Sequence, residues 1–366
     1  MIRDRIGAIA RYIVTVLLLA VLFLATGSGW VLGLTALLLL TGVTSLAANL
    51  YVRKYIRGEI TIPTTVAKET ECEGILRLEN RSRLPAPKLC CKLGLVNDLT
   101  REEAELDLFA GMGAKRETTC PFRLESRFCG RIYVYLKSTS ILDYFGLFGL
   151  SVPVTASARI TVLPELFSCD AEVSPAAAVS DDSTAARKGD DRTETFQLRE
   201  YRSGDDIRQI HWKLSSKLGN LILREPSQSI SRSILVFWDK RKETAPENMD
   251  AMAEVTASVC QALCDRGISF DLGWTEKEEW ELQSIRDEDA LLQTIPALVT
   301  QAGSGDCPEP DTSGYGQVIR ITGEIPEGEI PGNTVLLLCT REPYGNGKII
   351  SFGWENYREK LERLEL

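Results

Sequence analysis

The sequence contains a single histidine, His211, among 366 residues, and its ten cysteines include no Cys-x-x-Cys pair. A zinc site needs about four Cys, His or carboxylate ligands at short spacings, and histidine-based acid–base catalysis needs a partner that positions the imidazole. These scarcities argue against a zinc site or another bound cofactor. They favour a packed, structural role for His211 over a role as base or ligand.

Negative charge outnumbers positive charge outside the N-terminal segment. Residues 1–57 carry six Lys or Arg side chains and one Asp, which leaves 36 basic and 50 acidic side chains in the remainder. Binding to a nucleic-acid backbone needs clustered positive charge. The acidic balance therefore argues against nucleic acid as the main partner, although residues 196–225 hold six basic and four acidic side chains.

Charged residues are absent from Tyr12 to Val52, and Gly27-Ser28-Gly29 divides this run into two apolar pieces. Each piece is close to the roughly 20 residues that cross a bilayer as a helix. A cleaved signal peptide would also fit the basic start, but a second apolar piece follows immediately. Because basic residues flank the outer ends and the central turn has none, we expect a hairpin with residues 12–52 in the bilayer of the cell membrane and both ends in the cytoplasm.

Three further segments are expected after this hairpin, which ends at residue 57. Alternating apolar and polar residues in 58–166 predict an antiparallel β-sandwich, expected to act as a spacer or docking module. Residues 167–197 are expected to form a linker, because residues 175–195 lack an apolar period. This linker is either a plain connector or a cover over the segment after it. From residue 198 to 366, apolar runs alternate with helical patterns, which predicts an α/β domain.

The segment 198–225, LREYRSGDDIRQIHWKLSSKLGNLILRE, concentrates charge, a glycine turn and the sole histidine. Asp205 or Asp206 can cap a helix in which apolar residues recur at helical spacing until Gly219. His211 shares that apolar stripe, so we expect it to be packed. The charged residues form either a buried network or contact surface, or a solvated face; they are Arg199, Glu200, Arg202, Asp205, Asp206 and Arg208.

The stretch L-R-E-Y-R-S-G-D-D-I-R-Q-I-H-W-K, residues 198–213, resembles the signature of the bacterial family called domain of unknown function 58. Members of that family carry a Leu-Arg-x-Tyr-x-x-Gly-Asp-x-x-Arg-x-Ile-x-Trp core. The similarity extends over most of the chain and includes the paired apolar pieces and the β-rich segment. The signature positions are Arg199, Tyr201, Gly204, Asp205, Asp206, Arg208, His211 and Trp212.

The resemblance implies a membrane-anchored protein with a von Willebrand factor A-like region, and no established activity. It also implies two partners, a MoxR-type AAA+ ATPase and a transglutaminase-like membrane protein, because such proteins are often encoded near family members. In von Willebrand A domains the first strand ends in Asp-x-Ser-x-Ser, whose oxygens bind a divalent cation. Here the strand is followed by Asp239-Lys240-Arg241-Lys242-Glu243.

The aspartate of that metal motif is kept, but both serines are lost and three basic residues follow. Hard cations need oxygen ligands and negative charge, so no metal is expected. Asp239 is expected to bond local backbone or Arg241. These patterns together predict a membrane-anchored cytoplasmic scaffold or adaptor, not an enzyme. The alternative is a hydrolase that uses Asp205, Asp206, His211 and Glu200 for acid–base chemistry, which requires them to converge in an open cleft.

Overall fold

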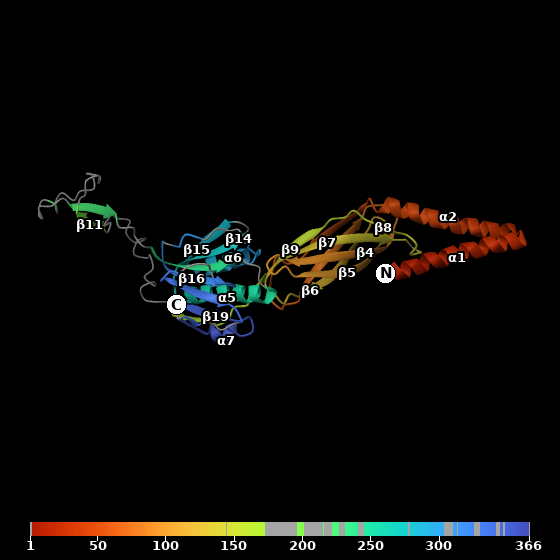
Figure 1. Ribbon diagram of the computed structural model, residues 1–366. Helices are drawn as coiled ribbons and strands as arrows, with labels where there is room; N and C mark the ends of the chain where they lie inside the picture. The colour runs from red at the N-terminus through yellow and green to blue at the C-terminus, as the bar shows by residue number, and fades with distance from the viewer. Residues whose placement is uncertain are drawn as a thin grey trace.

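The computed structural model arranges two helices, a two-sheet domain and an α/β domain one after another (Figure 1). The helices project from the end of the two-sheet domain that lies away from the α/β domain. The structure describes residues 2–143, 145–172, 196–200, 215, 222–226, 231–240, 245–276, 279–303, 310–312, 314–325, 330–341, 345–346 and 348–365.

The N-terminal apolar pieces form two antiparallel helices, α1 (Ile2–Thr26) and α2 (Gly29–Val52). Gly27 lies between them with φ +58°, a left-handed conformation that glycine adopts without steric cost. Both helices are long and apolar enough to cross a membrane. This finding supports membrane association, since a helix of about 20 apolar residues spans the hydrocarbon core.

Polar contacts connect the two helices to each other and to the next domain. The Tyr12 hydroxyl donates to the Leu38 carbonyl at 2.8 Å. Gly42 leaves room for this tyrosine, because a Cβ there would come within 2.6 Å of the hydroxyl oxygen. Ser45 Oγ donates to Asp143 Oδ2 at 2.9 Å. The second helix is therefore bonded directly to a loop of the two-sheet domain.

The two-sheet domain consists of a sheet with the order β1-β3-β6 and a sheet with the order β2-β9-β7-β4-β5, to which β8 adds on β7. All pairings are antiparallel except that of β2 with β9. Alternate residues of β3 are buried, and Leu76 and Leu78 share a core with Leu93 and Val134 of the other sheet. The bounds are β1 Ile56–Thr61, β2 Thr65–Ala67, β3 Cys72–Asn80, β4 Ala86–Asn97, β5 Glu103–Met112, β6 Glu117–Leu124, β7 Gly130–Leu142, β8 Gly149–Ser151 and β9 Ser157–Leu163.

The α/β domain is built on a seven-stranded sheet with the order β15-β14-β13-β16-β17-β19-β18. The strands from β14 to β19 in this order are parallel, and β15 and β18 pair antiparallel at the two edges. The strands are β13 Ser231–Asp239, β14 Phe270–Glu276, β15 Glu279–Ile285, β16 Tyr315–Thr322, β17 Thr334–Cys339, β18 Gly345–Asn346 and β19 Ile349–Phe352. The helices are α5 Pro246–Asp265, α6 Glu288–Leu298 and α7 Tyr357–Lys360.

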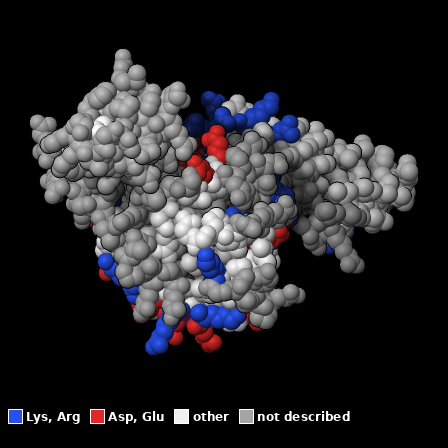
Figure 2. Space-filling view, turned by 60° about the vertical axis from the view of Figure 1, so that its left-hand side comes forward, with Lys and Arg blue, Asp and Glu red and all other residues white. Residues whose placement is uncertain are grey.

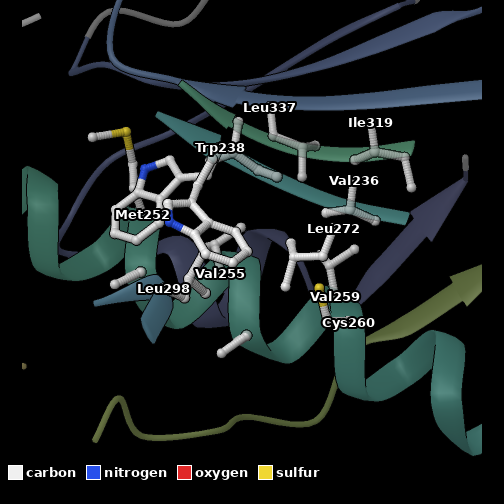
Figure 3. Packing of buried hydrophobic residues seen from close by; sticks show 14 of the residues in the cluster. Val236, Trp238, Met252, Val255, Val259, Cys260, Leu272, Leu298, Ile319 and Leu337 are labelled. Atoms are coloured by element: carbon white, nitrogen blue, oxygen red, sulfur yellow. The ribbon is translucent and has the colours of Figure 1, made fainter. Parts of the chain in front are cut away.

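The main core of this domain lies between the sheet and α5 (Figure 3). Trp238 and Val236 of the central strand face Met252 and Val255 of the helix. Proline suits the first turn of α5 because its missing N–H has no partner there anyway, and Pro246 occupies that position. Most of the surface of α5 is buried in the protein. A buried charged side chain on this helix therefore needs a partner.

Two short strand pairs complete the described structure. Strand β10 (Asp170–Glu172) pairs in parallel with β20 (Arg363–Glu365), and Ala171 belongs to the core of the α/β domain. The first part of the predicted linker is thus attached to this domain. Strand β11 (Phe196–Glu200) pairs antiparallel with β12 (Ile222–Pro226), and most of the signature lies in the sequence between them.

Candidate functional site

The carboxyl end of β13 is the position in this sheet where a ligand site is expected. Strand β14 follows β13 on one side, whereas β16 lies on its other side. In open α/β sheets, ligands bind beyond the carboxyl ends of the strands at the point where the chain changes direction in this way. The residues at that point are Asp239 and Lys240.

Asp239 is bonded to a cation from the neighbouring strand. Its Oδ2 atom accepts a hydrogen bond from Arg320 Nη2 at 2.7 Å, and both side chains are largely buried. Strand pairing explains the contact, because Phe237 lies beside Arg320 in the parallel register. Arg241, the partner suggested by the sequence, lies outside the described residues.

Lys240 is 1% exposed and fills the space at the end of the strand. Its Nζ atom donates to the carbonyls of Leu298 at 2.6 Å and Gln301 at 3.1 Å. Its backbone N–H donates to Thr275 Oγ1 at 2.9 Å. The last carbonyls of a helix have no partner within the helix, so this lysine closes the carboxyl end of α6 from inside the protein.

The electrostatics of Lys240 favour a neutral amine near physiological pH. Burial lowers its pKa to about 7, and Glu276 opposes this effect only in part. The nearest aromatic group is the Trp238 ring, whose centroid lies 4.7 Å from Nζ. Carbonyl dipoles and a ring face stabilise an ammonium less than a carboxylate does. Lys240 is therefore a buried amine without a counter-ion among the partners that bond it.

The donor set at this edge does not fit a divalent cation. The carboxylate of Asp239 is already neutralised by Arg320, and the Lys240 amine, bonded to the carbonyls of Leu298 and Gln301, offers no oxygen ligand. Calcium and magnesium need several oxygen ligands with net negative charge. Among the described residues, no three His, Cys, Asp or Glu side chains are grouped to hold a metal ion.

A second cluster of charged groups joins the two-sheet domain to the α/β domain. Asp250 and Glu254 lie four residues apart in α5, which places them on one face of the helix. Lys68, from the turn after β2, contacts Asp250 Oδ2 at 2.5 Å and Glu254 Oε1 at 2.6 Å. Asp250 Oδ1 also accepts from the Cys129 backbone N–H at 2.7 Å. Asp250 and Glu254 are thus both bonded to the two-sheet domain.

Glu254 has further partners from the C-terminal part of the chain. It is 0% exposed, and its Oε2 atom accepts from the Tyr357 hydroxyl and, at 2.9 Å, from Arg358 Nη2. Arg358 also bonds Glu165 at 2.6 Å. We call these groups the interdomain charge cluster; it comprises Lys68, Glu165, Asp250, Glu254, Tyr357 and Arg358.

Burial and the bonds within the cluster together shift the pKa values of its groups. Burial favours the neutral amine of Lys68, but its bonds to Asp250 and Glu254 outweigh burial and raise its pKa. Burial raises the pKa of Asp250 despite the bond from Lys68. Burial and the bond to Glu254 raise the pKa of Tyr357. The cluster therefore keeps Lys68 charged and the tyrosine protonated.

Most of the signature residues fall outside the described part of the chain. These are Tyr201, Gly204, Asp205, Asp206, Arg208, His211 and Trp212. The backbone of Arg199 belongs to β11, where it pairs with Leu223. The predicted helix cap at Asp205 or Asp206 and the packing of His211 stay predictions, and so does the convergence in a cleft that the hydrolase alternative requires.

Sequence reasoning missed the interdomain charge cluster. A usable signal exists in α5, where Asp250 and Glu254 interrupt the apolar run Met249–Val259 at a spacing of one helical turn. Carboxylates enclosed in an apolar helix must find a cation or be protonated. No local signal identifies that cation, because Lys68 lies 182 residues earlier in the chain than Asp250.

On the face shown in Figure 2, the described basic and acidic side chains are interspersed, without a broad area of one sign.

Comparison with solved structures finds only partial likeness. A CARDB domain from Pyrococcus furiosus is 13% identical with a TM-score of 0.22, covering 29% of this chain and 91% of that one. A cohesin module from a Clostridium perfringens glycoside hydrolase is 11% identical with a TM-score of 0.22, covering 29% and 96%. A β-glucosidase from Listeria innocua is 12% identical with a TM-score of 0.22, covering 30% and 16%. TM-scores this low carry no conclusion about function.

No curated protein matches the chain. A family model does match, over residues 197–292, which include the whole signature, strand β13 and helix α5. The match confirms the resemblance found in the sequence. Residues 197–292 match the model of the family described as Protein of unknown function DUF58.

Proposed function

We propose that the protein is a membrane-anchored cytoplasmic adaptor whose α/β domain presents the signature to a MoxR-type AAA+ ATPase. The observation that carries this proposal is the carboxyl end of β13, where Lys240 and the Asp239–Arg320 pair fill the place of a ligand. A sheet whose ligand position is filled by its own side chains is suited to binding through its surface. The family match is to a domain of unknown function and to no enzyme family.

The interdomain charge cluster supports the same proposal. An adaptor must hold its binding domain at a fixed place relative to its anchor. Glu254 bonds both Lys68 of the two-sheet domain and Arg358 of the α/β domain. Removing one partner from such a buried group is costly. The α/β domain is thereby held in a defined place relative to the helices α1 and α2. The resemblance to a von Willebrand A-like domain fits this proposal, because Asp239 ends β13, the first strand of the sheet in chain order.

Co-purification from native membranes tests the partner. Three arginines in the segment 198–225, Arg199, Arg202 and Arg208, are the proposed contact residues, because arginines often dominate binding surfaces. Their charge reversal should lower recovery of the AAA+ ATPase by about tenfold or more, while the melting temperature moves by about one or two degrees. The control variant carries Arg123→Glu and Arg127→Glu on the two-sheet domain.

Two results would contradict the adaptor. One is that no AAA+ ATPase is enriched above membranes lacking the protein. The other is that Asp206→Asn or His211→Gln leaves the melting temperature unchanged but abolishes the cellular phenotype, because an amide cannot replace a catalytic acid or base. The second result would favour the hydrolase.

The cytoplasmic orientation needs its own test. Membrane-impermeant thiol reagents added to intact cells should leave Cys307 unlabelled, since we place the α/β domain inside the cell. The buried thiols Cys129 and Cys260, whose pKa burial raises well above the usual range, do not report on topology because they are unreactive in the folded state. Labelling of Cys307 from outside would reverse the proposed orientation.

A further inference from the structure

Several loops of the two-sheet domain meet at the end from which α1 and α2 project (Figure 1). The backbone N–H of Arg81 donates to the Tyr55 carbonyl at 3.1 Å, and that of Lys115 donates to the Ser82 carbonyl at 3.0 Å. Strand register brings a further loop to the same end, because Leu142 pairs with Lys88 near the start of β4. We call this surface the membrane end; it consists of residues 53–55, 81–85, 113–116, 143 and 145–148.

One of these loops lies at the depth where the bilayer ends. Helix α2 begins at Gly29, and about 20 residues cross the hydrocarbon at 1.5 Å each. The helix therefore leaves the hydrocarbon within its last two turns. Ser45, slightly earlier, bonds Asp143 at 2.9 Å. The bond therefore holds the loop that follows Asp143 close to the boundary between the hydrocarbon and the lipid headgroups.

Apolar side chains of the membrane end face outward. Phe145 is 58% exposed, and Leu84 is 40% exposed. Tyr51 and Tyr55, at the end of α2, are exposed to a similar degree and their ring centroids lie 4.9 Å apart. Aromatic rings are typical of the membrane–water interface. Burial within the protein does not explain these four side chains, whereas contact with lipid does.

The charged side chains of the membrane end are mostly basic. Its loops carry Arg53, Lys54, Arg81, Arg83, Lys115 and Arg116. Glu79 pairs with Arg81 at 2.8 Å, and Asp143 is buried. Arg83, Lys115 and Arg116 are exposed and form no ion pair within the described part of the chain. Lysine and arginine close to an anionic leaflet are attracted to it.

We propose that the membrane end is a binding surface for anionic phospholipid headgroups. Arg83, Lys115 and Arg116 contact the headgroup phosphates, and Leu84 and Phe145 insert between the headgroups. Contacts at several separate loops resist tilting of the domain, which a helical hairpin alone does not. The inference rests on membrane anchoring by α1 and α2, and it does not depend on the adaptor role.

Hydrogen exchange of the full chain in lipid nanodiscs tests this surface. Nanodiscs of phosphatidylcholine alone are compared with nanodiscs that also contain phosphatidylglycerol. Amides in 81–84 and 113–116 should exchange about tenfold more slowly with the anionic lipid, and the difference should shrink at high salt, because surface charges are screened. The turn at 125–129, at the other end of the domain, should exchange equally in both lipids.

A matched pair of variants separates headgroup binding from other causes. Arg83→Glu with Lys115→Glu should remove the lipid-dependent difference, whereas Arg123→Glu with Arg127→Glu, with the same change in charge, should preserve it. Melting curves of both variants in detergent check that each is folded. Equal exchange of the wild-type chain in the two lipids would overturn the proposal. A lipid-dependent difference that persists in the Arg83→Glu, Lys115→Glu variant would also overturn it. Neither result involves the ATPase, so it leaves the adaptor proposal untouched.

Discussion

Lys68 is partly buried and Lys240 is fully buried, and their surroundings shift their pKa values in opposite directions. Lys68 lies between two carboxylates at the domain boundary, and its pKa is raised. Lys240 lies at the end of the central strand among carbonyls and a tryptophan ring, and its pKa is lowered to about 7. Burial alone therefore does not determine the charge of a lysine; the charge of its acceptors does.

The two regions differ accordingly in what they contribute. A charged lysine between carboxylates joins two domains, because separation would expose or isolate all three charges. A neutral amine on helix carbonyls closes one domain internally without attracting an anion. The comparison predicts that the two lysines respond differently to substitution, to pH and to metal ions.

The largest effect is expected at the domain boundary. Lys68→Ala leaves Asp250 and Glu254 buried with less compensation, and breaking a buried pair in this way costs about 3–5 kcal/mol. Thermal or denaturant unfolding of the full chain in detergent measures the loss. Arg123→Ala is the control, since it breaks an exposed pair with Glu71 worth at most about 1 kcal/mol. Equal losses of unfolding free energy in the two variants would show that the interdomain charge cluster does not hold the two domains together.

The pH dependence of stability should distinguish the two lysines next. Lys240 has a lower pKa in the folded state than the ordinary value of 10.5, so between these values the unfolded chain binds the extra proton. Its contribution to stability is present at high pH and is lost as pH falls through about 7. Relative to Lys240→Met, the wild-type chain should gain about 2 kcal/mol from about pH 7.5 to about pH 9.

Lys68→Met is the matched control for that measurement. The pKa of Lys68 is raised, so its contribution is present below the unfolded value and is lost only as pH rises through the higher folded value. The stability difference between wild type and Lys68→Met should therefore be flat over the same range. A flat difference for Lys240→Met as well would mean that the carbonyls of Leu298 and Gln301 keep Lys240 protonated.

The smallest effect is expected from divalent cations. Because Arg320 occupies the Asp239 carboxylate, magnesium or calcium at millimolar concentration should change the melting temperature by less than about one degree. A ligand that binds only the folded state must raise apparent stability by mass action. A clear magnesium-dependent rise that Asp239→Ala removes would show that the carboxylate is available after all.

The parts of the fold that depend on local pattern could be predicted from the sequence. The apolar run at 12–52 became α1 and α2, and the helical patterns expected within 198–366 include α5 at Pro246–Asp265. Period-two alternation in 58–166 became the strands of the two-sheet domain, as the burial along β3 shows. Such segments carry their own periodicity, so a single sequence suffices to recognise them.

The candidate sites depend on partners that are distant in sequence. Arg320 reaches Asp239 because β16 lies beside β13, a pairing that no local spacing encodes. Lys240 precedes Arg241 and Lys242 and therefore resembles one more solvated charge in the sequence, although it is buried. The short strand β10 escaped notice because its partner β20 lies at the other end of the chain.

The separation of the cluster residues along the chain has a consequence for biosynthesis. Asp250 is made 182 residues after Lys68, and Arg358 another 104 residues after Glu254. At about 5–20 residues per second, Asp250 is synthesised roughly 10–40 s after Lys68. Arg358 is synthesised roughly 5–20 s after Glu254. The domain boundary therefore forms last, long after the whole helical hairpin has been synthesised. Ribosome stalling between residues 254 and 358 should yield a chain that is inserted in the membrane but open to proteolysis at this boundary.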